Sequence, residues 1–586
     1  MNHPVQALAP DLWATLRGVF ELNPHAFVAS LALKDSILVA LAIVVLAGLS
    51  EAIGQSVVLF ANRIPPARFA YSLAITAVLF VFSYVFLTLS TWAITYLPLA
   101  TRIPLRSLAI VYAVSYAPLL FAFLEALPYA GLAIGSGLRI WYLLASLVGV
   151  AAVGDLPLQY AILYVGVGWL VFVAARQTLG KPILLFGLRV MSAVSGVSFQ
   201  PEESRALELA QQSQAQGQQP SASAVRAHKQ LHPLTGRWQV VAGLLGFIVI
   251  CVVIAVAFRP LQSLMFGWTV HLPAPLRVPF DLLWFGLVAA LVAALLAPLE
   301  TLGWWAGWYG DDIAPNAAHV AGPGAAGISR YMIYLDGIGQ SSSQYTPDVE
   351  NFLDALEPTL PPRICLLRGL MVYSVLNKPL DQDPIWSSFW RIVEKTRLAD
   401  PASILGMFIN LRNVIIVAVS ADSRYGPIYN YGIAKLLYEG LVDNGYPVGS
   451  GVPVTLVGYS GGGQMSAAAA TFLKRAIGAP IEVISLGGVM SGTSNFLDLE
   501  HLHHLVGDKD NVERLGPLLF ASRWKIVWNS YWNRARKRGI IEWISLGPVG
   551  HQVPGGMFDP VARLSDGRTN LQSTLLRIAD IVRAKI

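Results

Sequence analysis

The chain has 586 residues, of which 55% are hydrophobic and only 13% charged, and its mean hydropathy is +0.55. Such a composition is too apolar for an ordinary soluble protein and predicts membrane-spanning segments. The net charge of +6 is modest for this length, and the sequence has no Lys/Arg array of the kind that follows a nucleic-acid backbone. We therefore expect the lipid bilayer, and not nucleic acid, as the partner.

Apolar segments long enough to cross a bilayer, which takes about 20 residues per helix, are concentrated in the first half of the chain. We predict about seven spans, near residues 36–60, 69–97, 106–127, 131–152, 158–175, 238–258 and 279–300. The first five form a bundle within residues 1–198, and the hydropathy pattern of residues 12–198 resembles the Yip-type membrane domain. Residues 1–24 lack a basic segment followed by an apolar core, so we expect no cleavable signal peptide.

Residues 199–237 separate this bundle from the last two spans, which lie within residues 238–303. The interruption is polar and rich in Gln, Pro and Ser, a composition typical of a linker. The densest positive charge among the spans lies in and around it, at Arg176, Lys181, Arg189, Arg205, Arg226, Lys229 and Arg237. By the positive-inside rule this loop is cytoplasmic. Because two spans follow it, the C-terminal domain should also be cytoplasmic.

Residues 325–586 have a different pattern, with short apolar runs separated by Gly, Pro, Asp and Asn, which indicates a soluble domain. Strands are expected at residues 331–335, 363–367, 414–419, 454–457, 481–486, 502–506 and 540–546, with helices between most of them. Alternation of buried strands with helices predicts a mainly parallel sheet covered on both faces. The expected fold class is therefore a multi-span α-helical membrane bundle followed by an α/β domain.

The most informative motif follows the fourth predicted strand. There the chain reads Gly458-Tyr459-Ser460-Gly461-Gly462 and continues into an Ala-rich helix, which gives G-x-S-x-G between a strand and a helix. A serine in this setting occupies a strained turn that only very small flanking residues tolerate. Its hydroxyl would lie at a helix N-terminus, where the dipole favours a developing negative charge. On these residues the domain resembles the α/β-hydrolase superfamily.

That resemblance implies two partners for Ser460, in the chain order Ser, Asp, His. Asp510 follows the sixth predicted strand and matches the acidic member, with Asp508 as the alternative. Either aspartate could instead merely cap the helix expected to begin near Val512. His551 follows the seventh predicted strand in a Gly-rich turn and matches the histidine. His551 would remove the proton from Ser460, and Asp510 would orient the imidazole.

An oxyanion hole would come from backbone N–H groups in two loops. One donor is expected at Gly461, the residue after the serine, and the other at Gly337 or Ile338, after the first predicted strand. That second loop reads Asp-Gly where the superfamily often has His-Gly, and a simple glycine turn is the alternative interpretation.

Two further segments have more than one interpretation. Residues 369–412 form a long, Trp-containing connection that could be a lid, a membrane-dipping cap or a surface insertion. Residues 523–538 mix tryptophans with basic residues, which fits either an anionic membrane interface or a solvated basic helix packed by its aromatic side chains.

A cluster of histidines near residue 502 raises the question of a metal site. Of His501, His503 and His504, only His501 and His503 share a strand face, and we find no nearby Cys or carboxylate that completes a ligand set. The Gly-rich segments lack the spacing of a nucleotide-binding loop. We therefore expect no metal and no other cofactor.

Together, these features predict a membrane-anchored serine hydrolase of the esterase, lipase or thioesterase type, acting on an ester or thioester of an amphipathic or lipid substrate. A hydrolase-like scaffold without activity that organises lipids or partner proteins is one alternative, and a transporter with a regulatory domain is another. Few ionisable residues lie in the predicted spans; the exceptions are Glu51, Glu125 and Asp155, near their ends, which argues against a transporter. The sequence leaves the substrate and the oligomeric state open.

Overall fold

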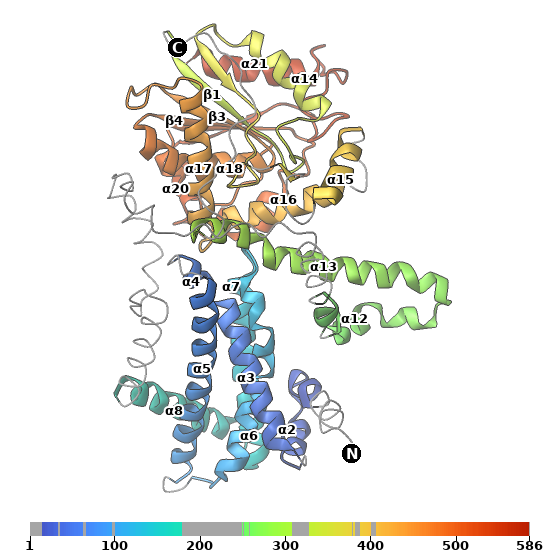
Figure 1. Cartoon of the computed structure of the whole chain (residues 1–586), viewed down its shortest axis with the longest axis vertical. Helices are drawn as coiled ribbons and strands as arrows, with labels where there is room; N and C mark the ends of the chain where they lie inside the picture. The colour runs from blue at the N-terminus through green and yellow to red at the C-terminus, as the bar shows by residue number, and fades with distance from the viewer. Residues whose placement is uncertain are drawn as a thin grey trace. The chain divides into compact units, whose positions relative to one another are not determined.

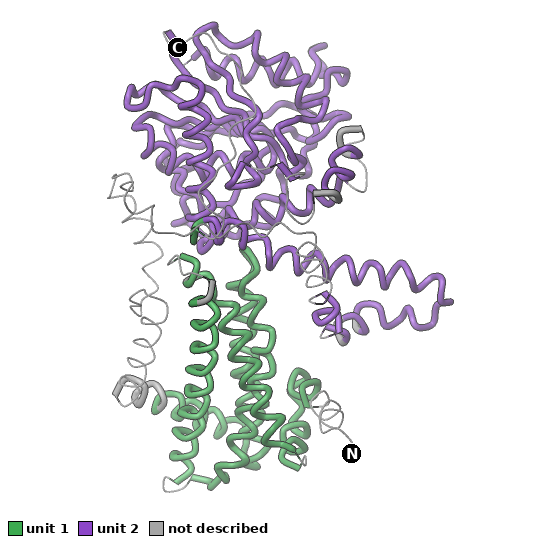
Figure 2. Tube along the Cα trace, viewed as in Figure 1, with its two compact units in different colours: residues 1–208, 305–308 green, residues 209–304, 309–586 purple. Residues whose placement is uncertain are grey.

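The computed structural model describes residues 15–32, 35–61, 66–96, 100–178, 249, 251–256, 258–307, 327–377, 379–380, 387–399 and 406–584. The chain separates into two compact units, residues 1–208 with 305–308 and residues 209–304 with 309–586 (Figure 2). The predicted linker at 199–237 and most of the predicted span at 238–258 lie outside the described residues.

The first unit consists of helices (Figure 1). In chain order these are α2 (Pro24–Ala32), α3 (Ser36–Gly54), α4 (Val57–Ala61), α5 (Pro66–Ile94), α6 (Leu105–Ser115), the 3₁₀ helix η1 (Ala117–Ala126), α7 (Gly131–Gly154) and α8 (Leu158–Thr178). Apolar side chains from these helices form a common core. Many others, such as Leu38 and Ile140, are exposed in the isolated chain, as expected for helices that face lipid.

Five described helices are long and apolar enough to cross a membrane, namely Ser36–Gly54, Arg68–Ile94, Leu105–Ala126, Gly131–Gly154 and Ala274–Trp305. They coincide with the predicted spans at 36–60, 69–97, 106–127, 131–152 and 279–300. The predicted span at 158–175 coincides with α8, of which a shorter stretch, Leu158–Val171, is apolar. These helices support a membrane protein.

Three charged side chains join helices within the bundle. Arg139 of α7 donates to both carboxylate oxygens of Glu125 in η1, at 2.7 and 2.8 Å, and lies 3.2 Å from the carboxylate of Glu51 in α3. A carboxylate in an apolar bundle is costly unless it is paired. The Glu125–Arg139 pair therefore allows a buried acid to lie between membrane helices.

The second unit contains α12 (Arg259–Phe266), η3 (Gly267–His271), α13 (Ala274–Trp305) and a C-terminal α/β domain. The domain has six parallel strands in the order β2-β1-β3-β4-β5-β6. The strands are β1 (Arg330–Leu335), β2 (Ile364–Leu367), β3 (Val454–Tyr459), β4 (Ile481–Leu486), β5 (His501–Val506) and β6 (Ile541–Ser545). The parallel sheet and six of the seven predicted strands are thus confirmed.

Helices cover both faces of this sheet (Figure 1). One core joins the strands to α14 (Pro347–Leu356) and α21 (Asn570–Arg583), while α17 (Gly426–Asp443) and α18 (Gly461–Ile477) pack together on the other face. All residues of β1, β3 and β4 are buried, as expected for central strands covered on both sides. The remaining helices are η4 (Glu357–Thr359), α15 (Ser387–Ala399), α16 (Gly406–Ala421), η6 (Phe496–Asp498), α19 (Leu515–Leu519), η7 (Ala521–Arg523) and α20 (Tyr531–Lys537).

The predicted strand at 414–419 is wrong, because these residues belong to α16. Over six residues, an apolar run cannot be assigned to a buried strand or a buried helix by periodicity. The burial pattern of the longer segment has helical spacing, with Ile409, Asn413, Ile416 and Val417 buried. The apolar outer side of α16 obscures this pattern in the sequence.

Candidate active site

Two loops meet where the strand order reverses. The chain passes from β1 to β2 on one side of β1, whereas β3 lies on its other side. In open parallel sheets, ligands bind outside the carboxyl ends of the strands at such a switch point. The loop after β1 contains Gly337, and Ser460 follows β3 directly; a Cβ atom built on Gly337 would lie 3.3 Å from Cβ of Ser460. The two loops predicted to cooperate are therefore in contact.

The backbone of Ser460 is strained. Its φ of 52° and ψ of −118° are rare for a residue with a side chain. The chain can make this turn because its neighbours are small: a Cβ atom on Gly458 would lie 2.5 Å from the carbonyl oxygen of Gly462, and one on Gly462 would collide with the carbonyl of Leu335. Ser460 therefore occupies a sharp strand-to-helix turn immediately before α18, where it is buried.

Asp510 and His551 are paired. Oδ2 of Asp510 lies 2.8 Å from Nδ1 of His551, and both side chains are buried. Oδ1 of Asp510 accepts hydrogen bonds from the N–H groups of Val512 and Glu513, so this aspartate caps a turn as well. Asp508 is exposed and accepts a hydrogen bond from Ser545 Oγ instead. The structure thus brings Asp510, and not Asp508, to the histidine.

Tyr459 and Gly487, which the sequence analysis did not select, shape the surroundings of His551. The Tyr459 ring stacks on the His551 ring with centroids 5.1 Å apart, and its hydroxyl donates to the backbone oxygen of His551 at 2.9 Å. A Cβ atom on Gly487 would lie 2.5 Å from Oδ2 of Asp510 and 3.1 Å from Nδ1 of His551. Tyr459 is the unspecified residue of G-x-S-x-G, and Gly487 belongs to no motif, so neither could be selected from the sequence.

The loop after β1 contains a buried carboxylate. Oδ1 of Asp336 accepts hydrogen bonds from the N–H of Gly337 at 2.8 Å and from the hydroxyl of Tyr334 at 3.0 Å. Burial raises the pKa of Tyr334 well above its usual value, so this hydroxyl stays protonated and able to donate. In the described part of the chain, the N–H groups of Ile338 and Gly461 have no hydrogen-bond acceptor. A Cβ atom on Gly461 would lie 2.8 Å from Cγ2 of Ile338, so the two loops are adjacent here too.

Helix α16 covers these loops. Asn413 donates to the carbonyl oxygens of Ile338 at 2.7 Å and Gln340 at 2.6 Å. A Cβ atom on Gly461 would lie 3.1 Å from Cγ2 of Val417. The opposite side of α16 carries exposed apolar side chains, namely Met407, Phe408, Leu411 and Val414. The predicted connection at 369–412 therefore ends in a helix that is buried on the side of Ser460 and apolar on the side of solvent.

The loop that carries Asp510 rests on a second buried network. His504 Nε2 lies 3.2 Å from Glu513 Oε1, which also accepts from Arg523 at 3.1 Å. Burial lowers the pKa of His504, an effect that Glu513 opposes. The pKa of Glu513 is lowered by His504 and Arg523, although burial opposes this. Because the N–H of Glu513 donates to Asp510, the network fixes the position of the acidic side chain.

A cavity of about 280 Å³ opens beside this network, lined by Val506, Gly507, Asp508, Asp510, Glu513, Arg514, Trp543, Ile544 and Ser545. Neither Ser460 nor His551 lines it. The cavity therefore adjoins the acidic side chain and not the serine hydroxyl.

The segment at 523–538 contains both buried and exposed side chains. Arg523 is buried, with its guanidinium 4.2 Å from the ring centroid of Trp532. Trp524, Ile526 and Trp528 are 50%, 81% and 78% exposed. Aromatic packing thus holds one side of the segment, while Trp524, Ile526 and Trp528 form an exposed apolar loop.

A carboxylate lies close to the histidine cluster near residue 502. Glu542 of β6 lies beside His501 and His503 of β5, so the expectation that no nearby carboxylate completes a set is wrong. The residues meet because β6 pairs with β5. Strand order was not readable from the sequence, in which Glu542 and His503 are 39 positions apart.

No family model matches this chain, and no curated protein and no solved structure shows significant similarity to it. The structure defines the class broadly, as a membrane protein with a C-terminal α/β domain built on a parallel sheet. Any function must therefore be argued from the geometry of the site.

Proposed function

We propose that this protein is a membrane-anchored serine hydrolase of the esterase, lipase or thioesterase type. The observation that carries the proposal is the buried Asp510–His551 pair, whose histidine stacks on the residue preceding a strained Ser460. Ser460, Asp510 and His551 follow β3, β5 and β6, which agrees with the chain order of α/β-hydrolases. That agreement supports membership of the α/β-hydrolase superfamily as part of the proposal.

In the proposed reaction, His551 acts as the general base. Its Nδ1–H donates to Asp510, which leaves the lone pair on Nε2 to accept the proton of the Ser460 hydroxyl. The serine oxygen attacks the carbonyl carbon of the substrate and forms a tetrahedral oxyanion. His551 then protonates the departing alcohol or thiol, and a water molecule activated by the same histidine hydrolyses the acyl-enzyme.

The oxyanion would be bound by the N–H groups of Gly461 and Ile338. Both come from loops at the switch point, and Gly461 begins α18, whose dipole favours a negative charge. Gly337 is less suited to this role, because its N–H donates to Asp336. Asp336 would instead stabilise the loop that presents Ile338.

The surroundings of the site favour an amphipathic or lipid substrate. Ser460 is only 4% exposed, and α16 lies against the loop that presents Ile338. The outer side of that helix is apolar. Leu518, Ile526 and Trp528 are further exposed apolar side chains, and α20, the next helix along the chain, has basic residues in its last turn. Such surfaces are suited to an anionic membrane interface from which a lipid ester or thioester could enter.

We further propose that the α/β domain faces the cytoplasm. The support is the excess of Lys and Arg at residues 176–237, followed by two predicted spans before the domain. A reporter fused after Ile586 should be active in the cytoplasm. Activity restricted to the outer side would overturn this orientation.

Labelling with a fluorophosphonate tests the hydrolase proposal directly, because this probe forms a covalent bond only with an activated serine. Detergent-solubilised full-length protein should label, and peptide mapping should find the adduct on Ser460. Ser460→Ala should abolish labelling, whereas Ser466→Ala, a buried serine of α18, should not. If the folded wild-type protein never labels, the alternative of a hydrolase-like scaffold without activity replaces this proposal.

A further inference from the structure

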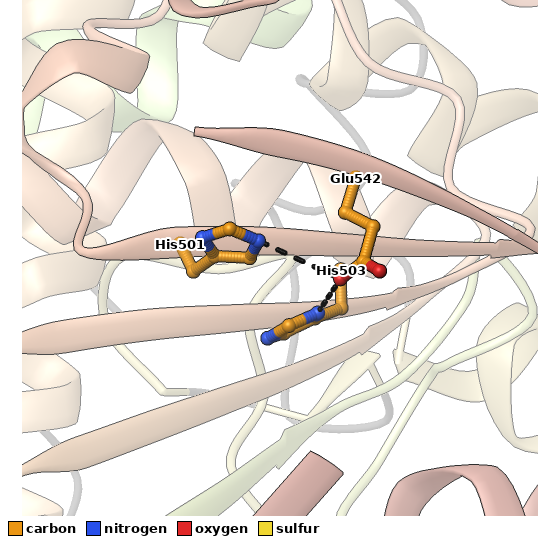
Figure 3. A group of neighbouring side chains, drawn as sticks. All are labelled: His501, His503 and Glu542. Carbon is orange, nitrogen blue, oxygen red and sulfur yellow. Dashed lines mark hydrogen bonds and ion pairs between the residues drawn. The ribbon is translucent and has the colours of Figure 1, made fainter. Parts of the chain in front are cut away.

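Two histidines and a carboxylate from neighbouring strands meet on one face of the sheet (Figure 3). His501 and His503 are two residues apart on β5 and therefore share a face, and the register of β5 with β6 pairs His503 with Glu542. Oε2 of Glu542 lies 2.8 Å from Nδ1 of His503 and 3.6 Å from Nε2 of His501. One ligand atom from each residue lies within 4.8 Å of the other two.

A different carboxylate binds the second ring nitrogen of His503. Nε2 of His503 lies 2.9 Å from Oε1 of Glu482 on β4, and the other oxygen of Glu482 accepts from Arg330 at 3.1 Å. A neutral imidazole has one N–H group and one lone pair, so it can donate to only one of the two carboxylates. The geometry therefore favours a positively charged species between Nδ1 of His503 and the Glu542 carboxylate.

We propose that this species is a divalent metal ion of the zinc class, bound by His501 Nε2, His503 Nδ1 and the Glu542 carboxylate. Zinc takes imidazole and carboxylate ligands at about 2.0–2.2 Å, and tetrahedral geometry then separates the ligand atoms by roughly 3.4 Å. The distances of 2.8 and 3.6 Å bracket that separation. Glu482 would accept the Nε2–H of His503, as outer carboxylates do when they orient metal-bound histidines.

The site is open to solvent and separate from the proposed catalytic residues. The side chains of His501 and Glu542 are 26% and 52% exposed, so an ion can enter and a water molecule can complete its coordination. These two residues lie at the amino ends of β5 and β6, whereas Asp510 and His551 follow the carboxyl ends. The bound ion would join β5 to β6, and this inference does not depend on the hydrolase proposal.

Zinc binding by the full-length protein tests the inference. The protein is purified in detergent with a tag that contains no histidine, stripped with a chelator, and titrated with Zn²⁺ in competition with a chromophoric chelator. Wild type should bind one Zn²⁺ at this site, and its melting temperature should rise with zinc. His501→Asn and Glu542→Gln should each weaken zinc affinity at least roughly tenfold. A tenfold loss is the lower end of what removal of a group that orients a metal ligand causes.

Glu500→Gln is the matched control, since Glu500 is an exposed neighbouring carboxylate that pairs with Lys474. This variant should bind zinc as wild type does. Glu542→Gln replaces an exposed side chain with one of the same shape, so its zinc-free melting temperature should stay near that of wild type. The inference is overturned if wild type binds no zinc. It is also overturned if both ligand variants keep wild-type affinity.

Discussion

Asp510 binds His551 through one carboxylate oxygen and the backbone of its own loop through the other. Oδ2 lies 2.8 Å from Nδ1 of the histidine, while Oδ1 accepts from two backbone N–H groups. A carboxylate bound on both sides cannot rotate away from the imidazole. The pair is thus set in place by the backbone that follows β5.

Asp510→Asn should reduce activity by roughly 10⁴-fold, the loss known for this change in a serine protease, because the amide stabilises the wrong imidazole tautomer. An asparagine can still cap the turn with its own oxygen, so the fold should persist. The measurement is the rate of fluorophosphonate labelling, with the melting temperature as a check on folding. Asp508→Asn is the control and should label almost as wild type; the reverse order would exchange the roles of the two aspartates.

Ser460→Gly should be more stable than Ser460→Ala. A side chain at φ of 52° and ψ of −118° costs about 1–3 kcal/mol, and glycine relieves part of this strain. Both variants lack the hydroxyl, so neither should label and only the backbone differs. Thermal unfolding of the two proteins in the same detergent measures the difference, and equal melting temperatures would contradict a strained serine.

Met407→Ser combined with Leu411→Ser should slow hydrolysis of long-chain esters in vesicles several-fold and leave a short soluble ester nearly unaffected. These side chains lie on the exposed apolar side of α16, where they would contact lipid without touching the reacting groups. The assay compares the two substrates on each variant. Val448→Ser removes an equally exposed apolar side chain elsewhere; if it has the same effect as the double variant, α16 has no special role.

His504→Asn should flatten the acid dependence of stability. Burial lowers the pKa of His504 below its usual 6.5, so below pH 6.5 the unfolded chain binds a proton that the folded chain does not. The contribution of neutral His504 to the free energy of unfolding is therefore complete above pH 6.5. It is lost as the pH falls, by at most about 1.4 kcal/mol per pH unit. The measurement is the melting temperature of each protein between pH 7.5 and pH 5.5, where wild type should lose more than the variant. Equal losses in the two proteins would contradict a role for His504.

The sequence predicted elements with strong local signals and missed relationships between distant segments. The strand before Ser460 and the helix after it were readable because glycines and an Ala-rich run mark the turn. The apolar run at 414–419 was misread because its length suits either a strand or a helix. Glu542 was missed because its position beside His503 depends on which strands pair. Asp510 and Asp508 could be distinguished only by the path of the chain after β5.

Gly487 follows β4, far in sequence from both members of the pair it accommodates. Any side chain there would occupy the space of the Asp510–His551 contact, and the positive φ of 55° would add strain. The residue at position 487 consequently indicates whether a related chain retains the Asp510–His551 pair. In descendants of this chain that keep the pair, position 487 is expected to remain glycine, whereas a lineage that abandons the pair is free to change it. A substitution at position 487 would therefore indicate, from sequence alone, that the Asp510–His551 contact has been lost, even in a chain that still has Ser460.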